Sequence, residues 1–165
     1  MDARRLTTAE WTREARLLAA ALLLVLSACA SDAPISRLDG LSEAIGEQVR
    51  RGPGTRFCLG ELTGSALKPP AAWDRVSIFG PYTSPEQVRE VLGTDWYGDD
   101  ARAIRRDDLW DLLVFQSGGR VVAAGLHPRG SGDFDTASVG RYHTVERACF
   151  VVNPPADDWY TLRPG

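Results

Sequence analysis

Hydrophobic residues recur along the chain at two different spacings, which separate an early helix from later strands. Over residues 36–51 the apolar positions are three or four apart, a spacing that places them on one face of a helix. Ser36 is a suitable N-cap, and Gly52-Pro53 ends the pattern. The apolar face of this expected helix consists of Leu38, Leu41, Ile45 and Val49.

Later segments are short and apolar or alternating, as β-strands are. We expect strands at residues 55–61, 74–79, 109–116, 120–126 and 144–152, a loop at 63–72 and a turn-rich stretch at 94–108. Ser117-Gly118-Gly119 predicts a tight hairpin turn between the third and fourth strands. Trp159-Tyr160 are expected to fold back over an edge of the sheet.

Residues 84–93 carry the strongest helix signals of the chain. Ser84 is placed as the N-cap, Pro85 occupies the first helical position, Gln87 completes a capping box, and Gly93 supplies a left-handed exit. We expect the buried stripe of this helix to consist of Val88, Val91 and Leu92.

The order helix, strand, strand, helix, hairpin, strand predicts one α+β domain over residues 36–165. We expect a mainly antiparallel sheet of about five strands with two helices packed on one face. The chain contains no Gly-x-Gly-x-x-Gly, P-loop or Gly-x-Ser-x-Gly motif, which removes the commonest motif-based enzyme assignments. The sequence therefore predicts a protein that is not an enzyme and holds no cofactor or metal.

The first 28 residues have the pattern of an export signal. Four arginines precede an uninterrupted apolar run, residues 17–26, which is shorter than the roughly 20 residues that span a bilayer. Leu26-Ser27-Ala28-Cys29 follows this run and resembles the lipobox of bacterial lipoproteins. The resemblance implies that residues 1–28 are removed and that Cys29 carries diacylglycerol and, in many bacteria, a further acyl chain such as palmitate. The alternatives are an ordinary secreted protein and a retained anchor helix.

Residues 29–35 then form a short lipidated tether, which makes the membrane the first partner of the protein. In envelopes with two membranes, Asp directly after the lipidated cysteine is associated with retention at the inner membrane. Ala30 occupies that place, so the sequence favours the outer membrane, facing the periplasm or the surface.

Composition and charge are those of a globular protein without a nucleic-acid-binding surface. Hydrophobic residues make up 44% and charged residues 25% of the chain, as in ordinary globular proteins. The formal net charge is −3, and −4 once residues 1–28 leave with their four arginines and three acids. This acidic balance gives no electrostatic basis for binding nucleic acid.

Loss of the leader leaves two cysteines free of lipid, Cys58 and Cys149, each in a strand-like stretch. Export favours one disulfide between them, provided that the two strands are neighbours. The alternatives are two buried free thiols and a catalytic or metal-binding role, although the spacing is not that of a zinc site.

Two further resemblances involve the middle of the chain. Residues 73–84 and 126–134 look like segments of an uncharacterised family of small exported lipoproteins. More loosely, residues 84–93 followed by a Trp-containing stretch and a hairpin are similar to small lipoproteins of outer-membrane assembly. Both resemblances imply an envelope location, and the second implies a protein partner in envelope assembly or maintenance.

Two groups of residues are candidates for a binding site. His127, Arg129, Asp133 and His143 flank a Gly-rich loop and could converge on a small anion or a metal. The structural alternative is that His127-Pro128 ends a strand, Arg129 and Asp133 pair, and His143 is solvated. Tyr82, Trp96 and Tyr97 could instead anchor a protein interface, unless Trp96 merely closes the loop after the helix. We favour a membrane-anchored module that contacts an envelope protein, with the anion- or metal-binding protein as the alternative.

The lipid anchor is testable by the substitution Cys29→Ala. Without the thiol the chain cannot be diacylglycerated, so we expect an unprocessed precursor or a soluble protein in membrane fractionation. Mature-length Cys29→Ala protein that stays fully in the membrane would contradict the lipoprotein assignment.

Overall fold

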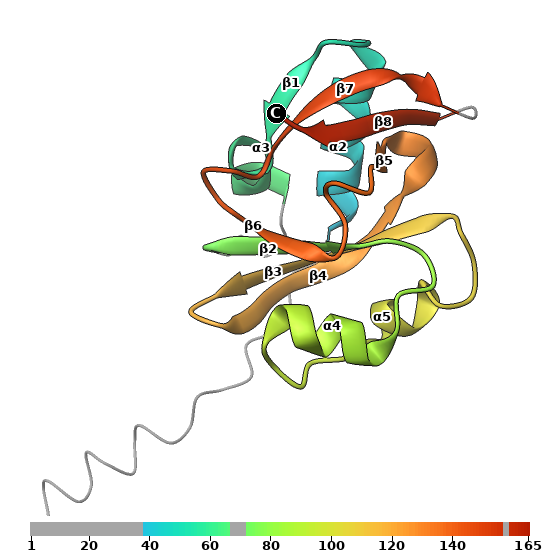
Figure 1. Ribbon diagram of the computed structural model, residues 1–165. Coiled ribbons are helices and arrows are strands. Elements are labelled where there is room, and N and C mark those ends of the chain that lie inside the picture. Colours follow the sequence, from blue (N-terminus) through green and yellow to red (C-terminus); the bar gives the residue numbers. More distant parts are fainter. Residues whose placement is uncertain (1–37, 67–71, 157–158) are drawn as a thin grey trace, which may run out of the picture. The chain divides into compact units, whose positions relative to one another are not determined.

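Eight strands form two four-stranded sheets in the part of the chain that the computed structural model describes, residues 38–66, 72–156 and 159–165. The central sheet has the order β4-β3-β2-β6 and is antiparallel throughout (Figure 1). The second sheet has the order β1-β7-β8-β5, in which only β5 and β8 are parallel. The described residues belong to one unit, residues 34–165.

The strands of the central sheet are β2 (Arg75–Phe79), β3 (Trp110–Ser117), β4 (Arg120–Pro128) and β6 (Arg141–Thr144). Those of the second sheet are β1 (Arg56–Cys58), β5 (Asp133–Phe134), β7 (Cys149–Ala156) and β8 (Trp159–Pro164). The described helices are α2 (Asp39–Arg50), α3 (Leu59–Ala66), α4 (Pro85–Leu92) and α5 (Asp99–Ala103), with a short 3₁₀ turn η1 (Arg129–Ser131).

The central sheet is buried on both faces, which explains the unbroken apolar run of β3. Leu112 and Val114 pack into a cluster with α4 and α5 on one face. Leu113 and Phe115 point to the other face, where they join residues of α2 and of the second sheet. Both sets of side chains are fully buried, so the strand needs no polar face.

The α+β class is confirmed, whereas the detailed architecture differs from the expectation. There are two sheets instead of one sheet of about five strands, and helices lie on both faces of the central sheet: α4 and α5 on one, α2 on the other (Figure 1). Local spacing identifies a strand but does not say which strands pair. The division into two sheets is decided by contacts between residues far apart in the sequence.

Elements with strong local signals are where the sequence placed them. The helix after Ser84 begins with the predicted capping box, and Gly93 adopts the left-handed conformation at its end, with φ 66°. The predicted hairpin is β3–β4, closed by Gly118 and Gly119, and the predicted 74–79 strand is β2. The first helix begins at Asp39, and the predicted cap Ser36 lies outside the described residues.

Three expectations for secondary structure were wrong. The predicted strand at 55–61 ends at Cys58, and α3 occupies the remaining residues and part of the predicted 63–72 loop. The expected turn-rich stretch contains the helix α5. The predicted strand at 144–152 is divided between β6, which ends at Thr144, and β7, which begins at Cys149. Tertiary contacts stabilise α3, because Leu59 is fully buried and the Trp73 Nε1–H donates to Thr63 Oγ1 at 2.9 Å. Short helices of this kind depend more on packing than on propensity.

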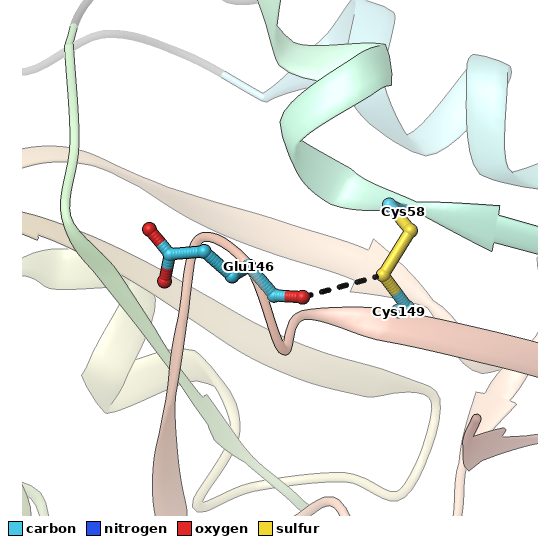
Figure 2. Close-up of a disulfide and its surroundings, with 3 residues drawn as sticks. All are labelled: Cys58, Glu146 and Cys149. Carbon is cyan, nitrogen blue, oxygen red and sulfur yellow. Dashed lines mark hydrogen bonds between the residues drawn. A yellow bond between two sulfur atoms is a disulfide. The ribbon is translucent and has the colours of Figure 1, made fainter.

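Cys58 and Cys149 form a disulfide, which settles the alternatives for these two residues. They are directly opposite each other in the β1–β7 pair, and the bond joins residues 91 apart in sequence (Figure 2). The Cys149 sulfur also lies 3.8 Å from the carbonyl oxygen of Glu146, in the turn that leads from β6 into β7. The bridge fixes the short β1 strand to the second sheet.

We predict that the double substitution Cys58→Ala/Cys149→Ala lowers the free energy of unfolding by roughly 4 kcal/mol, because it removes the closure of a long loop in the unfolded chain. Urea unfolding of the purified protein measures this. Treating wild type with a reductant should give the same loss and leave the double variant unchanged; equal stability with and without the bridge would contradict the prediction.

Candidate functional site

Arg129 and Asp133 form the expected ion pair, at the turn that follows β4. The Arg129 Nε–H donates to Asp133 Oδ1 at 2.6 Å and its Nη2–H to Oδ2 at 2.9 Å. Its Nη1–H donates to the carbonyl of Asp108 at 2.7 Å, and the guanidinium lies 4.8 Å from the centre of the Trp159 ring. The Asp133 hydrogen bonds and charge raise the pKa of Arg129. Both side chains are thus committed to ordering the turn.

His127, at the end of β4, is fully buried and belongs to the core. Its Nε2 lies 2.9 Å from the carbonyl oxygen of Gly132, and because a carbonyl only accepts, Nε2 carries the proton. Its ring packs edge-on against Phe134 at 5.6 Å between centroids. Burial lowers the pKa of His127 to about 4, so the imidazole is neutral at pH 7.

His143 does not join this group, and the expectation that it is solvated was wrong. It lies on β6, at the opposite edge of the central sheet from β4, and only 9% of its surface is exposed. Its Nε2–H donates to the carbonyl of Ser138 at 2.9 Å, and its ring packs against Phe150 at 5.6 Å. The two histidines therefore serve matching structural roles at the two edges of the sheet.

Asp111 is the unforeseen member of the cluster near His127. It is almost fully buried, directly opposite His127 in the β3–β4 pair, and its Oδ2 accepts the backbone N–H of Phe134 at 3.2 Å. Its Oδ1 has no hydrogen-bond partner in the structure. Burial raises the pKa of Asp111 to about 7. The sequence signal was an acid inside the apolar run Trp110-Asp111-Leu112.

This end of the hairpin offers little for a ligand to bind. His127 and Asp133 lie close together, but the imidazole is neutral and buried, and the Asp133 carboxylate is taken up by Arg129. Across the described residues, no group of three or more His, Cys, Asp or Glu side chains is arranged to hold a metal ion. The arrangement stabilises the loop.

A different site lies between α4 and β6, where the structure contains a groove of about 620 Å³. Its apolar lining comes from Phe79 at the end of β2, Val91 of α4 and Val139 of the loop before β6. Polar and amphipathic side chains complete the lining: Thr83, Gln87, Glu90, Arg141 and Tyr142. Tyr142 is 54% exposed, although it is a large aromatic residue.

Tyr82, a predicted interface residue, lies in the turn that precedes α4, directly before the groove-lining residue Thr83. It is 65% exposed, and its φ of 62° places it in the left-handed region, which is costly for a residue with a side chain. The Tyr82 N–H donates to the carbonyl of Ile104 at 2.7 Å, and Thr83 Oγ1 donates to the carbonyl of Gly80 at 2.7 Å. These hydrogen bonds hold the backbone of the turn in place, and the aromatic side chain of Tyr82 is exposed on it.

Trp96 and Tyr97, the other candidate interface residues, lie in the loop after α4. Both are partly buried against the cluster under α4 and α5, and a Cβ on Gly98 would lie 2.7 Å from the Trp96 ring. Trp96 thus closes the loop after α4. Tyr97 lies between two guanidinium groups, at 5.6 Å from Arg89 and 5.8 Å from Arg102.

Comparison with known proteins assigns no relative: no protein family, curated protein or solved structure matches the chain. Among the described helices, none has the length and hydrophobicity needed to cross a bilayer. The predicted lipidation site Cys29 and its tether lie outside the described residues. Functional inference therefore depends on the leader sequence and on the geometry above.

The buried Asp111 predicts a specific pH dependence. Its folded-state pKa, about 7, is above the ordinary value of 3.8, so its contribution to stability is present below pH 4 and is lost as the pH rises through 7. Wild type should therefore lose roughly 4 kcal/mol relative to Asp111→Asn in the free energy of unfolding as the pH rises from 4 to 8. Urea unfolding across this range measures the difference.

The pH dependence that His127 gives to stability has the opposite sign. Because its pKa is lowered, its contribution to stability is present above pH 6.5 and is lost as the pH falls through 4. The comparison of Asp111→Asn with wild type cancels that shared effect. Asp95→Asn, which removes an exposed carboxylate, is the control. A difference between Asp111→Asn and wild type that stays constant with pH would contradict a buried, protonated Asp111.

Proposed function

We propose that this protein is a lipid-anchored lipoprotein of the bacterial envelope whose domain acts without catalysis, by binding a partner protein in the groove between α4 and β6. The observation that carries the proposal is the exposed Tyr142 in the lining of this groove, together with the exposed Tyr82, which directly precedes the lining residue Thr83 and has a strained backbone conformation. Such strain is retained where the surrounding structure enforces it, and it is common at binding sites.

The groove has the form of a site for an extended peptide. Among the described strands, β6 pairs with β2 alone, so its other side is an edge of the sheet. The Val145 N–H donates to the carbonyl of Asp74 at 3.0 Å. By the alternation of antiparallel pairs, the backbone N–H and C=O of Tyr142 point away from β2. A partner segment could pair with Tyr142 as an added strand, as in known modes of peptide recognition.

The side chains around this edge suit such a segment. The apolar residues of the groove provide a pocket for one side chain of an added strand, while Gln87, Glu90 and Arg141 offer polar contacts at its margin. Exposed tyrosines are frequent anchors of protein interfaces, because they bury a large area at a small entropic cost. Tyr82 and Tyr142 would cover the two sides of the bound segment.

The leader supports the envelope part of the proposal. The lipobox residues Leu26-Ser27-Ala28-Cys29 predict a lipid anchor, and Ala30 favours the outer membrane. Two or three acyl chains hold a protein durably to a bilayer, whereas one chain binds reversibly. We propose envelope maintenance or assembly as the role. The alternative, a small anion or metal bound by the turn after β4, gains no support, because Arg129 and Asp133 already satisfy each other.

Tyr82→Gly separates binding from stability. Glycine takes the left-handed conformation without strain, so we expect the variant to unfold at an equal or higher temperature than wild type, with a gain of up to about 1 kcal/mol. The same variant should lose the partner in crosslinking of intact cells followed by detergent purification. A variant that is both more stable and fully able to capture the partner would contradict the role of Tyr82.

Tyr142→Ala tests the other side of the groove, with Leu109→Ala as the matched control. Leu109 is 52% exposed, and it lies outside the groove. We expect partner recovery to fall at least tenfold for Tyr142→Ala and to be unchanged for Leu109→Ala, measured by quantitative mass spectrometry. Equal recovery with both variants, or no reproducible partner of wild type, would reject the proposed surface.

A further inference from the structure

A second hollow, of about 390 Å³, lies at α5 and the turn after it. Its lining consists of Tyr97 and three arginines, Arg102, Arg105 and Arg106. All three arginines are exposed, and the residues that line the hollow include no acid. The arginines belong to residues 95–108, a segment that also carries five aspartates, but none of these acids lines the hollow.

Tyr97 organises the hollow. Its hydroxyl donates to the carbonyl of Ala101 at 3.1 Å, which fixes the ring against α5. Arg102 lies over that ring, and Arg89 of α4 also contacts it, so both guanidinium groups are held by cation–π contacts. Positive groups held in this way lose less conformational entropy when an anion binds.

The nearby acids cancel only part of this charge. Asp99 pairs with Arg102, and its side chain is 93% exposed, so the pair is a weak surface contact. Arg89 pairs with Asp95 at 2.8 Å, again with an exposed carboxylate. Asp107 Oδ1 accepts the backbone N–H of Leu109 at 3.1 Å. Hydrogen bonds lower the pKa of the Glu86 carboxyl, and Arg105 lies near enough to lower it further, although no acid lines the hollow itself.

We infer that the hollow formed by Tyr97, Arg102, Arg105 and Arg106 binds a phosphate group. Guanidinium groups match the oxygens of phosphate with paired hydrogen bonds, and several of them favour a doubly charged anion over a single carboxylate. The phosphate could belong to a soluble molecule or to the headgroup of an anionic lipid, since the recognition chemistry is the same. The inference depends on this hollow alone and not on the partner-binding groove.

The test is hydrogen–deuterium exchange of the purified full-length lipoprotein in neutral detergent, titrated with inorganic phosphate at constant ionic strength. We expect saturable protection of residues 97–106. Arg105→Gln/Arg106→Gln should weaken the apparent affinity at least tenfold. Arg120→Gln/Arg147→Gln removes the same charge from two other exposed arginines and should leave the affinity unchanged.

A second arm distinguishes the sources of phosphate. The same protein in nanodiscs of phosphatidylglycerol or of phosphatidylcholine reports whether an anionic lipid protects residues 97–106. Protection in phosphatidylglycerol but not in phosphatidylcholine assigns the hollow to an anionic headgroup, and protection by soluble phosphate alone assigns it to a soluble ligand. Absence of protection under every condition, or equal loss in the two double variants, would overturn the inference.

Discussion

A row of four aromatic rings joins the two sheets, and the rest of the domain depends on it. Phe134 of β5 and Phe150 of β7 contact each other at 4.9 Å, and the rings of His127 and His143 pack on their outer sides at 5.6 Å each. The row therefore runs from the β4 edge of the central sheet to its β6 edge, beneath the second sheet. Edge-to-face contacts of this kind stabilise the fold beyond the contribution from burying the rings.

Each histidine also fixes a loop, which is why burying two imidazoles is tolerated. His127 donates to Gly132 and His143 to Ser138, in both cases a carbonyl five residues away. These hydrogen bonds offset part of the cost of burying the imidazoles, although the Nδ1 atom of His127 has no hydrogen-bond partner among the described residues. The turns before β5 and β6 are thus held by the core. The disulfide adds the last link, from β7 to β1.

This construction leaves the other face of the central sheet to carry α4 and α5, and the proposed sites are there. Two features of the fold could be predicted because their causes are local: the capping box fixes α4, and the glycine pair fixes the β3–β4 turn. The division into two sheets could not be predicted, because Phe134 and Phe150 come into contact only in the folded chain. For the same reason the sequence left a loop site open as one alternative for the histidines, whereas their hydrogen bonds to Gly132 and Ser138 and their burial place them in the core.

The candidate site was predictable only in part. Tyr82 was a candidate interface residue because Trp and Tyr dominate binding hot spots, and it is 65% exposed. The role of Tyr142 and the groove could not be predicted, because the groove forms only where β6 lies against α4. Tyr142 is more than fifty residues later in the chain than Tyr82. For Trp96 the sequence left two alternatives open, an interface anchor and closure of the loop after α4, and the ring packs against Gly98 and the cluster under α4 and α5.

We propose that the face of the domain with the groove between α4 and β6 contacts a partner, while the opposite surface is structural. Site-specific photocrosslinking in intact cells tests this most directly, with a photoreactive residue placed in turn at exposed positions over the domain. We predict that crosslinks to one protein concentrate at positions 87, 90 and 142 around the groove. Crosslinks confined to the opposite surface, at positions 51, 56 and 163, would contradict it.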